Sequence, residues 1–299
     1  MTWQVMGRLH APRHHLVMRD TPPHAPTVRP GAVGDLLRAW RSRRRRSQMD
    51  LALDVGVSTR HLSCIETGRA RPSPAMLEAL AGALDVPLRE RNRLLLAAGY
   101  APRYAERTLD DDGMRQVRGA LERLLRAHEP NPGLVLDRQW NLVLANRPAM
   151  ALAGLLPDAL KTPEFNVFRA SLHPQGLGAF TENFADWAHY LLATLQRAVA
   201  TSADPGLAAL QQEVLAYPNV AALLAAGLPP DAGADAPLLV PCVLRLPHLQ
   251  NARLSMFTTL TTFGTPRDIT LDELSIELFY PADDASEALL RSLHAALPS

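Results

Sequence analysis

Residues 48–66 read QMDLALDVGVSTRHLSCIE, and this stretch decides the fold of the first part of the chain. Two helices that cross steeply need a small residue where their backbones approach, which Ala52 supplies, and a turn residue that tolerates positive φ, which Gly56 supplies. The stretch therefore predicts two short helices joined by a tight turn. Four apolar side chains are expected to pack between the two helices: Val55, Val57, Leu62 and Ile65. The remaining side chains of the second helix and its end then lie on the outer face: Thr59, Arg60, Ser63, Cys64 and Thr67.

Start and stop signals around this stretch predict five helices between residues 33 and 98. Leu36, Leu37 and Trp40 give the first helix an apolar face. The other helices have recognisable starts: Ser47 caps the second with Asp50 as its reciprocal partner, Ser58 caps the third, Ser73-Pro74 opens the fourth, and the fifth runs from about Pro87 to Gly99. We expect an all-α five-helix domain over residues 31–100.

Charge is distributed unevenly along a chain of 299 residues whose formal net charge is only +1. Residues 31–106 hold 13 Lys and Arg against 8 Asp and Glu, residues 1–30 hold 4 against 1, and residues 107–299 hold 14 against 21. Attraction to phosphates depends on clustered positive charge, so only the first part of the chain is expected to meet a polyanion.

Other broad features of the sequence exclude several classes of protein. The apolar stretches are too short for the roughly 20 residues of a membrane-spanning helix, and Met1 to His15 lacks the apolar core of a signal peptide. Cys64 and Cys242 lie far apart and fit a reducing cytoplasm better than a disulfide framework.

Residues 1–30 are rich in Pro and are predicted to form a flexible arm. No metal is expected there, because the histidines of the arm lack Cys or acidic ligands at matching spacing: His10, His14, His15 and His24.

The second part of the chain predicts an α+β domain over residues 114–299, after a linker at 101–113 and beginning with a helix from about Met114 to Ala127. Two strands, Leu134 to Leu136 and Trp140 to Ala145, form a hairpin in which Trp140, Leu142 and Leu144 alternate to one face. Four helices and three strands then follow, at Arg147 to Leu156, Asn166 to Leu172, Thr181 to Ala200 and Pro205 to Ala216, and at Leu238 to Leu246, Arg253 to Phe263 and Ser275 to Tyr280. Pro241 suggests that the first of these three strands is an edge strand of one antiparallel sheet.

The 48–66 stretch with its flanking helices resembles the helix-turn-helix of the XRE family, the relatives of the lambdoid phage repressors. The resemblance implies a bacterial, cytoplasmic transcription regulator that binds double-stranded DNA. In that family the residue matching Gln48 opens the second helix and contacts DNA, and those matching Thr59, Arg60 and Cys64 face the major groove. Cys64 departs from the longer polar residues common at its position, and van der Waals contact with a thymine methyl is the most expected of it.

The remaining DNA contacts are expected from position and charge. Arg60 is suited to guanine O6 and N7, although a phosphate contact alone is the alternative. His61 either contacts a DNA phosphate or packs against the rest of the protein. The arginine run from Arg41 to Arg46 adds backbone attraction next to this unit, and a solvated face is its alternative. The predicted DNA-binding residues are Gln48, Ser58, Thr59, Arg60, His61, Ser63, Cys64, Arg69, Arg71, Arg43 and Arg44.

Beyond Tyr100 the chain resembles the ligand-binding domain of MmyB-like transcription regulators. The stretches that carry the resemblance are AAGYAPR at 97–103, LDRQWNLVLAN at 136–146, SLHP at 171–174, NFADW at 183–187 and TTFGT at 261–265. The resemblance implies a PAS-like sheet with helices over one face and a small apolar effector of the fatty acyl class. Residues that could line its pocket, or could equally be plain core, are Phe168, His173, Asn183, Phe184, Trp187, Leu191, Phe257 and Thr259.

The sequence leaves two regulatory functions open. The leading one is a ligand-responsive regulator that binds DNA as a homodimer. In the other, the C-terminal domain only dimerises and places two recognition helices about 34 Å apart on a palindromic site. An enzyme is disfavoured because the sequence contains no G-x-S-x-G, H-E-x-x-H, Walker loop or G-x-G-x-x-G, and no cofactor is expected.

Overall fold

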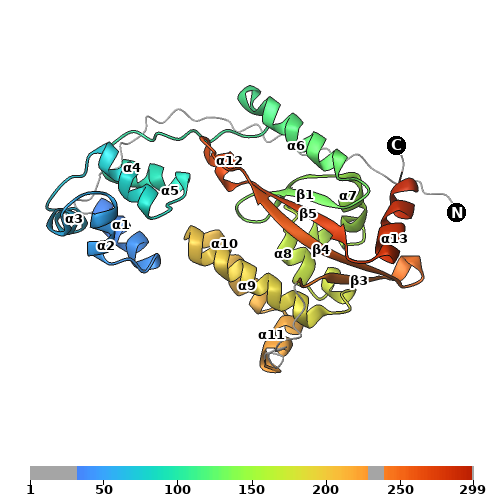
Figure 1. Ribbon diagram of the computed structural model, residues 1–299. Coiled ribbons are helices and arrows are strands. Elements are labelled where there is room, and N and C mark those ends of the chain that lie inside the picture. The colour runs from blue at the N-terminus through green and yellow to red at the C-terminus, as the bar shows by residue number, and fades with distance from the viewer. Residues whose placement is uncertain (1–31, 228–238, 298–299) are drawn as a thin grey trace.

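A computed structural model describes residues 32–227 and 239–297 of the chain. The N-terminal helices form a unit beside a larger sheet-containing domain, and an extended segment connects the two (Figure 1). The predicted arm at 1–30, with its four histidines, lies outside the described residues. The helices of the first unit are α1 (Ala32–Arg43), α2 (Gln48–Asp54), α3 (Thr59–Glu66), α4 (Pro74–Ala83) and α5 (Leu88–Ala97).

The predicted helix signals of the N-terminal domain are confirmed. Ser47 Oγ accepts from Asp50 N at 3.1 Å, and Asp50 Oδ2 accepts from Ser47 N at 3.3 Å, which makes a complete capping box. Ser58 and Ser73 cap α3 and α4 by accepting from His61 N and Met76 N, without the reciprocal bond of a capping box. Gly56 has a φ of 71°, so the turn between α2 and α3 uses the left-handed conformation that glycine adopts without strain.

A close approach between α1 and α3 was not predicted. Gly34 lies where a Cβ atom would come within 2.6 Å of the carbonyl oxygens of Ile65 and Glu66. Only glycine leaves room for backbones at this distance. Leu37, Leu62 and Ile65 are fully buried around this contact, so the orientation of α3 is set by α1 as well as by α2.

The C-terminal domain is built on one five-stranded sheet of order β2-β1-β5-β4-β3, in which all neighbours are antiparallel. This confirms the predicted α+β class. The strands are β1 (Gly133–Leu136), β2 (Leu142–Ala145), β3 (Cys242–Leu246), β4 (Ala252–Thr262) and β5 (Ser275–Pro281). The helices are α6 (Arg115–Ala127), α7 (Arg147–Ala153), α8 (Val167–Leu172), α9 (Phe184–Ser202), α10 (Pro205–Leu215), α11 (Pro218–Ala225), α12 (Ile269–Glu273) and α13 (Asp284–Ala295), of which α11, α12 and α13 were not predicted.

The predicted hairpin is present, but one detail of it was wrong. Leu136 pairs with Leu142 whereas Val135 pairs with Leu144, so Val143 is the extra residue of a β-bulge. The bulge places Leu142 and Leu144 on opposite faces, contrary to the alternation expected from the sequence. The strand also begins two residues later than predicted, because Trp140 has a φ of 65° and belongs to the turn.

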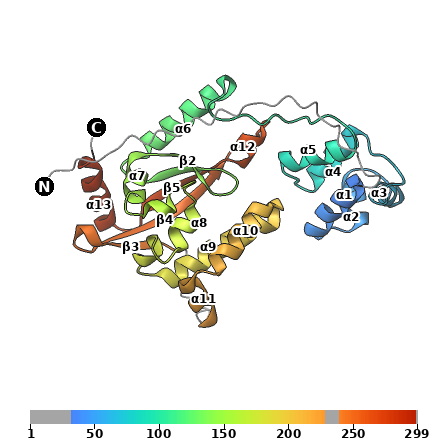
Figure 2. The same cartoon turned by 180° about the vertical axis from the view of Figure 1, so that it is seen from behind.

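Helices cover both faces of the sheet (Figures 1 and 2). On one face, Leu121 and Leu125 of α6 pack against Val135 of β1 and Ile276 of β5. On the other face, α8 and α9 pack against β3 and β4 in the largest apolar cluster of the described residues, and the predicted stripe of Trp187, Leu191 and Leu195 is buried there. The cavity described below lies inside this second layer.

β3 is an edge strand, as Pro241 suggested, although it begins at Cys242 and Leu238 lies outside the described residues. Its outer edge is covered rather than bare, because Arg245 N donates to Phe180 O and Glu182 N donates to Val243 O. Over residues 32–227 and 239–297, no helix is both long enough and apolar enough to span a membrane.

The Gly34 contact generates a stability prediction. Gly34→Ala should lower the free energy of unfolding by about 1–3 kcal/mol, because the added methyl group meets rigid backbone oxygens. Gly82→Ala in the exposed part of α4 is the matched control, since nothing lies within 4 Å of its Cβ position, and it should stabilise by about 0.5–1 kcal/mol. Urea denaturation of both variants checks this, and equal effects would contradict the close approach.

Candidate DNA-binding surface and ligand cavity

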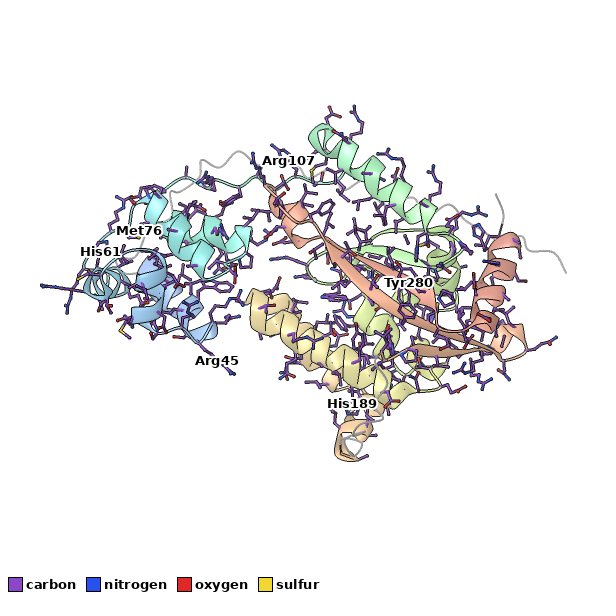
Figure 3. The ribbon with its side chains drawn as sticks, viewed as in Figure 1. Arg45, His61, Met76, Arg107, His189 and Tyr280 are labelled. Atoms are coloured by element: carbon purple, nitrogen blue, oxygen red, sulfur yellow. The ribbon has the colours of Figure 1, made fainter. Side chains whose placement is uncertain are left out.

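The outer face of α3 carries the predicted recognition residues. Thr59, Arg60 and His61 are exposed in its first turn, and Ser63 and Cys64 are half-buried further along. His61 points away from the rest of the protein (Figure 3), so the alternative that it packs in the core does not hold. Arg60 has no hydrogen bond or ion pair to any described residue. Its guanidinium is therefore free for an outside partner.

A buried carboxylate positions Gln48 and the end of α3. Glu66 is fully buried, and its two oxygens accept a bidentate pair from Arg41, Nε to Oε1 at 2.7 Å and Nη2 to Oε2 at 2.9 Å. Gln48 Nε2 donates to Glu66 Oε2 at 2.7 Å. Burial raises the pKa of Glu66, but the hydrogen bonds from Arg41 and Gln48 outweigh it and leave this pKa below its usual range. Charged Glu66 thus joins α1, α2 and α3, and it fixes the half-buried Gln48 at the start of α2.

The other predicted arginines fall into two groups. Arg69, in the loop after α3, is exposed without a partner among the described residues. Arg44 donates to the carbonyls of Leu84 and Asp85 at the end of α4, and Arg71 donates to those of Ala98 and Gly99 at the end of α5. Arg43 reaches carbonyls near the end of α9 at 3.3–3.4 Å. The structure therefore gives Arg43, Arg44 and Arg71 partners at helix ends, and their DNA contacts stay predictions.

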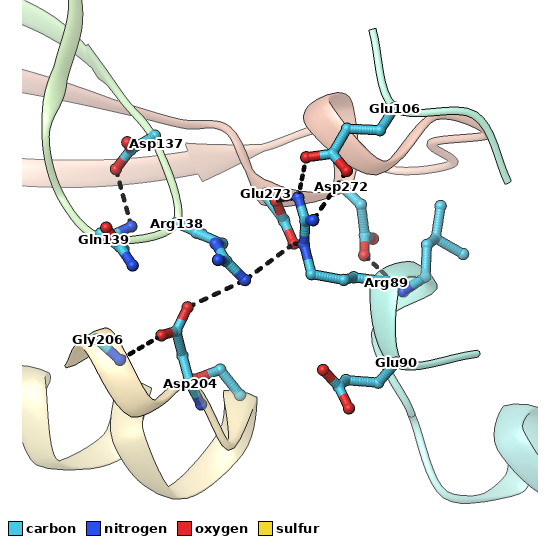
Figure 4. A network of polar contacts seen from close by, with 12 residues as sticks. Arg89, Glu90, Glu106, Asp137, Arg138, Gln139, Asp204, Gly206, Asp272 and Glu273 are labelled. Carbon is cyan, nitrogen blue, oxygen red and sulfur yellow. Dashed lines mark hydrogen bonds and ion pairs between the residues drawn. The ribbon is translucent and has the colours of Figure 1, made fainter. Parts of the chain in front are cut away.

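The two domains meet where α5 contacts α12 (Figure 4). The first residue of α5 has no cap from its own neighbours, and Leu88 N donates instead to Asp272 Oδ2 at 3.0 Å. Arg89 forms a bidentate pair with Glu273, Nε to Oε1 at 2.6 Å and Nη2 to Oε2 at 2.8 Å, and also pairs with Glu106. The hydrogen bonds that Arg89 donates to Glu273 and Glu106 raise the pKa of Arg89, which stays charged throughout.

The segment predicted as a linker is hydrogen-bonded to both domains. Asn92 of α5 donates to Tyr104 O and accepts from the amides of Arg103 and Tyr104. Ile269 N of α12 donates to Ala105 O at 2.8 Å, and Arg107 pairs with the buried Asp268 at 3.1 Å. Residues 103–107 are therefore held between α5 and α12.

A second set of charges extends this junction to α10. Arg138, in the turn of the β1–β2 hairpin, pairs with the buried Asp204 at 3.1 Å and lies 4.0 Å from Glu273. Asp204 in turn caps α10 through Gly206 N at 2.7 Å, as predicted. Between the domains these residues border a polar cleft of about 650 Å³.

An apolar cavity of about 70 Å³ lies between the sheet and helices α7, α8 and α9. Ligand pockets are commonly about 300–1,000 Å³, so a larger molecule requires the helices to move outward. Its walls include residues of every layer around it: Leu134, Leu142, Leu152, Leu156, Phe165, Val167, Leu177, Trp187, Leu191, Cys242, Leu244, Met256, Glu277 and Phe279.

Two of the eight predicted ligand residues, Trp187 and Leu191, lie at this cavity. The structure places the other six elsewhere. Phe168 is fully buried against Trp140, and Asn183 joins the start of α9 to β3 through Pro241 O and Val243 N. His173 packs on Tyr217, Phe257 stacks on Tyr280 over the opposite face of the sheet, Phe184 packs on the core, and Thr259 is exposed.

Glu277 is the cavity residue that sequence reasoning missed. It lies at the centre of β5, paired with Leu134 on β1 and Leu260 on β4, and only 5% of its surface is exposed. Its Oε2 atom is buried and has no hydrogen-bond partner among the described residues. Burial raises the pKa of Glu277 to about 7, against a smaller opposing effect of a hydrogen bond from Thr258. The thiol of Cys242, also at the wall, has its pKa raised to about 12 by burial and by Glu277, so it stays neutral.

One signal for Glu277 was present in the sequence. In Ser275 to Pro281 an acidic residue occupies the same face as Phe279, inside an otherwise apolar strand. A charge at an inward position of a central strand points to a special environment. The other cavity residues that the sequence analysis did not name carry no such signal, because small and aliphatic residues on α7 and α8 cannot be told from ordinary core residues by their sequence.

Comparison with known proteins identifies both domains. Residues 32–94 match the family model of a helix-turn-helix domain, which defines a DNA-binding protein. Residues 117–293 match the family model described as the MmyB-like transcription regulator ligand binding domain. This match covers more than half of the chain, and the chain belongs to that family of transcription regulators. A search of curated proteins found no significant match.

The raised pKa of Glu277 generates a pH prediction. The folded protein holds this proton up to about pH 7 and the unfolded chain releases it near 4.5, so the folded state binds more protons in this window and its stability falls as pH rises through it. Relative to Glu277→Gln, wild type should lose about 2.5 kcal/mol of unfolding free energy between pH 5 and pH 8. Urea denaturation at several pH values measures this difference. Parallel pH profiles of the two proteins would show that Glu277 is ionised in the fold.

Proposed function

We propose that this protein is a homodimeric, sequence-specific DNA-binding regulator whose operator affinity changes when an apolar molecule fills the cavity under α9. The observation that carries the proposal is that the cavity wall and the DNA-binding domain are joined through one short helix. β5 forms part of the cavity wall and follows directly on α12 in the chain. α12 in turn caps α5 of the helix-turn-helix domain and forms ion pairs with it. A ligand that displaces this wall therefore acts on the DNA-binding domain through hydrogen bonds and not only through a tether.

The family match supports DNA binding, and the exposed face of α3 supports readout in the major groove. Arg60 is the strongest candidate for base contact because its guanidinium is exposed and unpaired among the described residues, and because Arg pairs bidentately with guanine. Thr59, Ser63 and Cys64 lie beside it, and the amides that open α2 and α3 are positioned for phosphates. Gln48, held by Glu66, has a second amide hydrogen for a DNA contact.

An apolar ligand is supported by the composition of the cavity wall, which is almost entirely aliphatic and aromatic. Occupancy would spread α9 from the sheet. α9 ends at Ser202, next to the cap residue Asp204 and the Arg43 contact, so its movement reaches the junction from a second side. A homodimer would place two copies of α3 about 34 Å apart, which predicts a palindromic operator.

The competing function, a C-terminal domain that only dimerises, leaves the cavity and the α5–α12 contacts without a regulatory use. It predicts the same DNA contacts and no response to an apolar molecule. The two functions therefore differ in one measurable property, the coupling between cavity occupancy and operator affinity.

The DNA contact is tested with Arg60→Ala on the sequence that wild type selects from a random DNA library. The variant should lose about 1–3 kcal/mol on this sequence and relax preference at one base pair, while its affinity for random DNA changes little. Arg69→Ala is the matched control, because an exposed loop arginine that contacts only phosphate should weaken both DNAs alike. Equal losses on both DNAs for Arg60→Ala would exclude base readout.

The coupling is tested with benzene, a head-group-free probe that fills apolar cavities. Benzene should raise the melting temperature of wild type and change its operator affinity about fivefold or more. Asp272→Ala removes the cap of α5 and should keep the benzene stabilisation while reducing the operator response, and Asp272→Asn, which can still cap, should retain it. No operator response in wild type would contradict ligand sensing, and an undiminished response in Asp272→Ala would contradict the route through α12.

A further inference from the structure

Among the described residues that line the cavity under α9, Glu277 carries a buried atom whose hydrogen-bonding capacity is unused. Oε2 of Glu277 is buried, has no partner among the described residues, and belongs to a carboxyl group at the cavity wall. An acceptor oxygen left unpaired inside a protein costs free energy that a hydrogen-bond donor would recover. Native proteins rarely keep such atoms without a reason, and here the atom belongs to a residue that lines an apolar cavity.

We propose that this cavity selects apolar molecules with a hydrogen-bond-donating head group, an alcohol or an amine, and discriminates against those with a carboxylate. This inference rests on the proposed function, since it concerns the ligand of the same cavity. It changes the expected ligand class, because the sequence resemblance implied a fatty acyl effector, whose free carboxylate would meet Glu277.

The chemistry of the wall sets this preference. Of the residues that line the cavity on the sheet and on α7, α8 and α9, only Glu277 and Cys242 titrate, and the Cys242 thiol is neutral. Within residues 32–227 and 239–297, no arginine, lysine or histidine that could neutralise a carboxylate lines the cavity. A bound carboxylate would therefore be accepted only when Glu277 is protonated, whereas an alcohol can donate to Oε2 in either state and an amine can form an ion pair.

The test uses three probes of equal chain length, 1-hexanol, hexylamine and hexanoate, with binding measured by calorimetry and followed by the intrinsic tryptophan fluorescence, to which Trp187 at the cavity wall contributes. Each probe is larger than a cavity of about 70 Å³, so all three require a comparable outward movement of the helices and differ in their head groups. Wild type at pH 8 should bind hexanol and hexylamine at least about tenfold more tightly than hexanoate, because with a pKa of about 7 some nine-tenths of Glu277 is ionised there and must take up a proton first. Between pH 8 and pH 6, hexanoate binding should strengthen about tenfold and hexanol binding should stay constant.

Glu277→Gln keeps the shape of the side chain and removes its charge. In this variant hexanoate affinity at pH 8 should rise about tenfold and lose its dependence on pH, while hexanol affinity stays within about threefold, because the amide oxygen still accepts a hydrogen bond. Glu287→Gln on the exposed face of α13 removes the same charge far from the cavity wall and should behave as wild type.

The outcomes separate this inference from the proposed function. If hexanoate binds wild type as tightly as hexanol at pH 8, or if Glu277→Gln leaves the discrimination unchanged, the head-group inference is wrong while ligand binding stands. If neither benzene nor any hexyl probe binds, the proposed sensing function fails together with it. Cooperative urea unfolding of Glu277→Gln establishes that the variant is folded before either conclusion is drawn.

Discussion

The carboxylate of Asp272 on the first amide of α5 is the interaction on which the relation between the two domains depends. A helix leaves its first N–H groups without partners, and this helix, which begins after a proline, receives its cap from another domain. The adjacent Glu273 adds a bidentate pair to Arg89. Because both contacts come from one short helix, any rotation of α12 changes both at once.

Inside the N-terminal domain a second carboxylate plays a comparable part. Glu66 carries a full charge in a buried position, which is tolerated because Arg41 and Gln48 satisfy its oxygens. These three residues come from three helices, so α3 is held at both ends: by this cluster at its last residue and by the Ser58 cap at its first. The exposed side chains between them project from a rigid support, which is what discrimination between base pairs requires.

Local signals in the sequence predicted most of the N-terminal domain, because caps, prolines and the turn glycine act within three or four residues of their partners. The strand bulge at Val143 and the Gly34 contact were not predicted, since the first depends on how β2 pairs with β1 and the second on the backbone of a helix distant in the sequence. The same reason explains the ligand cavity. Trp187 and Leu191 were found on their helix stripe, whereas Glu277 and the α7 and α8 walls meet them only through sheet order and helix packing, which no local pattern encodes.

The capping of α5 also has a consequence for synthesis of the chain. Leu88 and Asp272 are separated by 184 positions, so the ribosome completes the entire helix-turn-helix domain long before the residue that caps its last helix exists. Domains generally fold in the order in which they emerge. In a nascent DNA-binding domain the first amide of α5 is therefore left to water, and it gains its carboxylate partner when α12 of the ligand-binding domain has been translated and has folded.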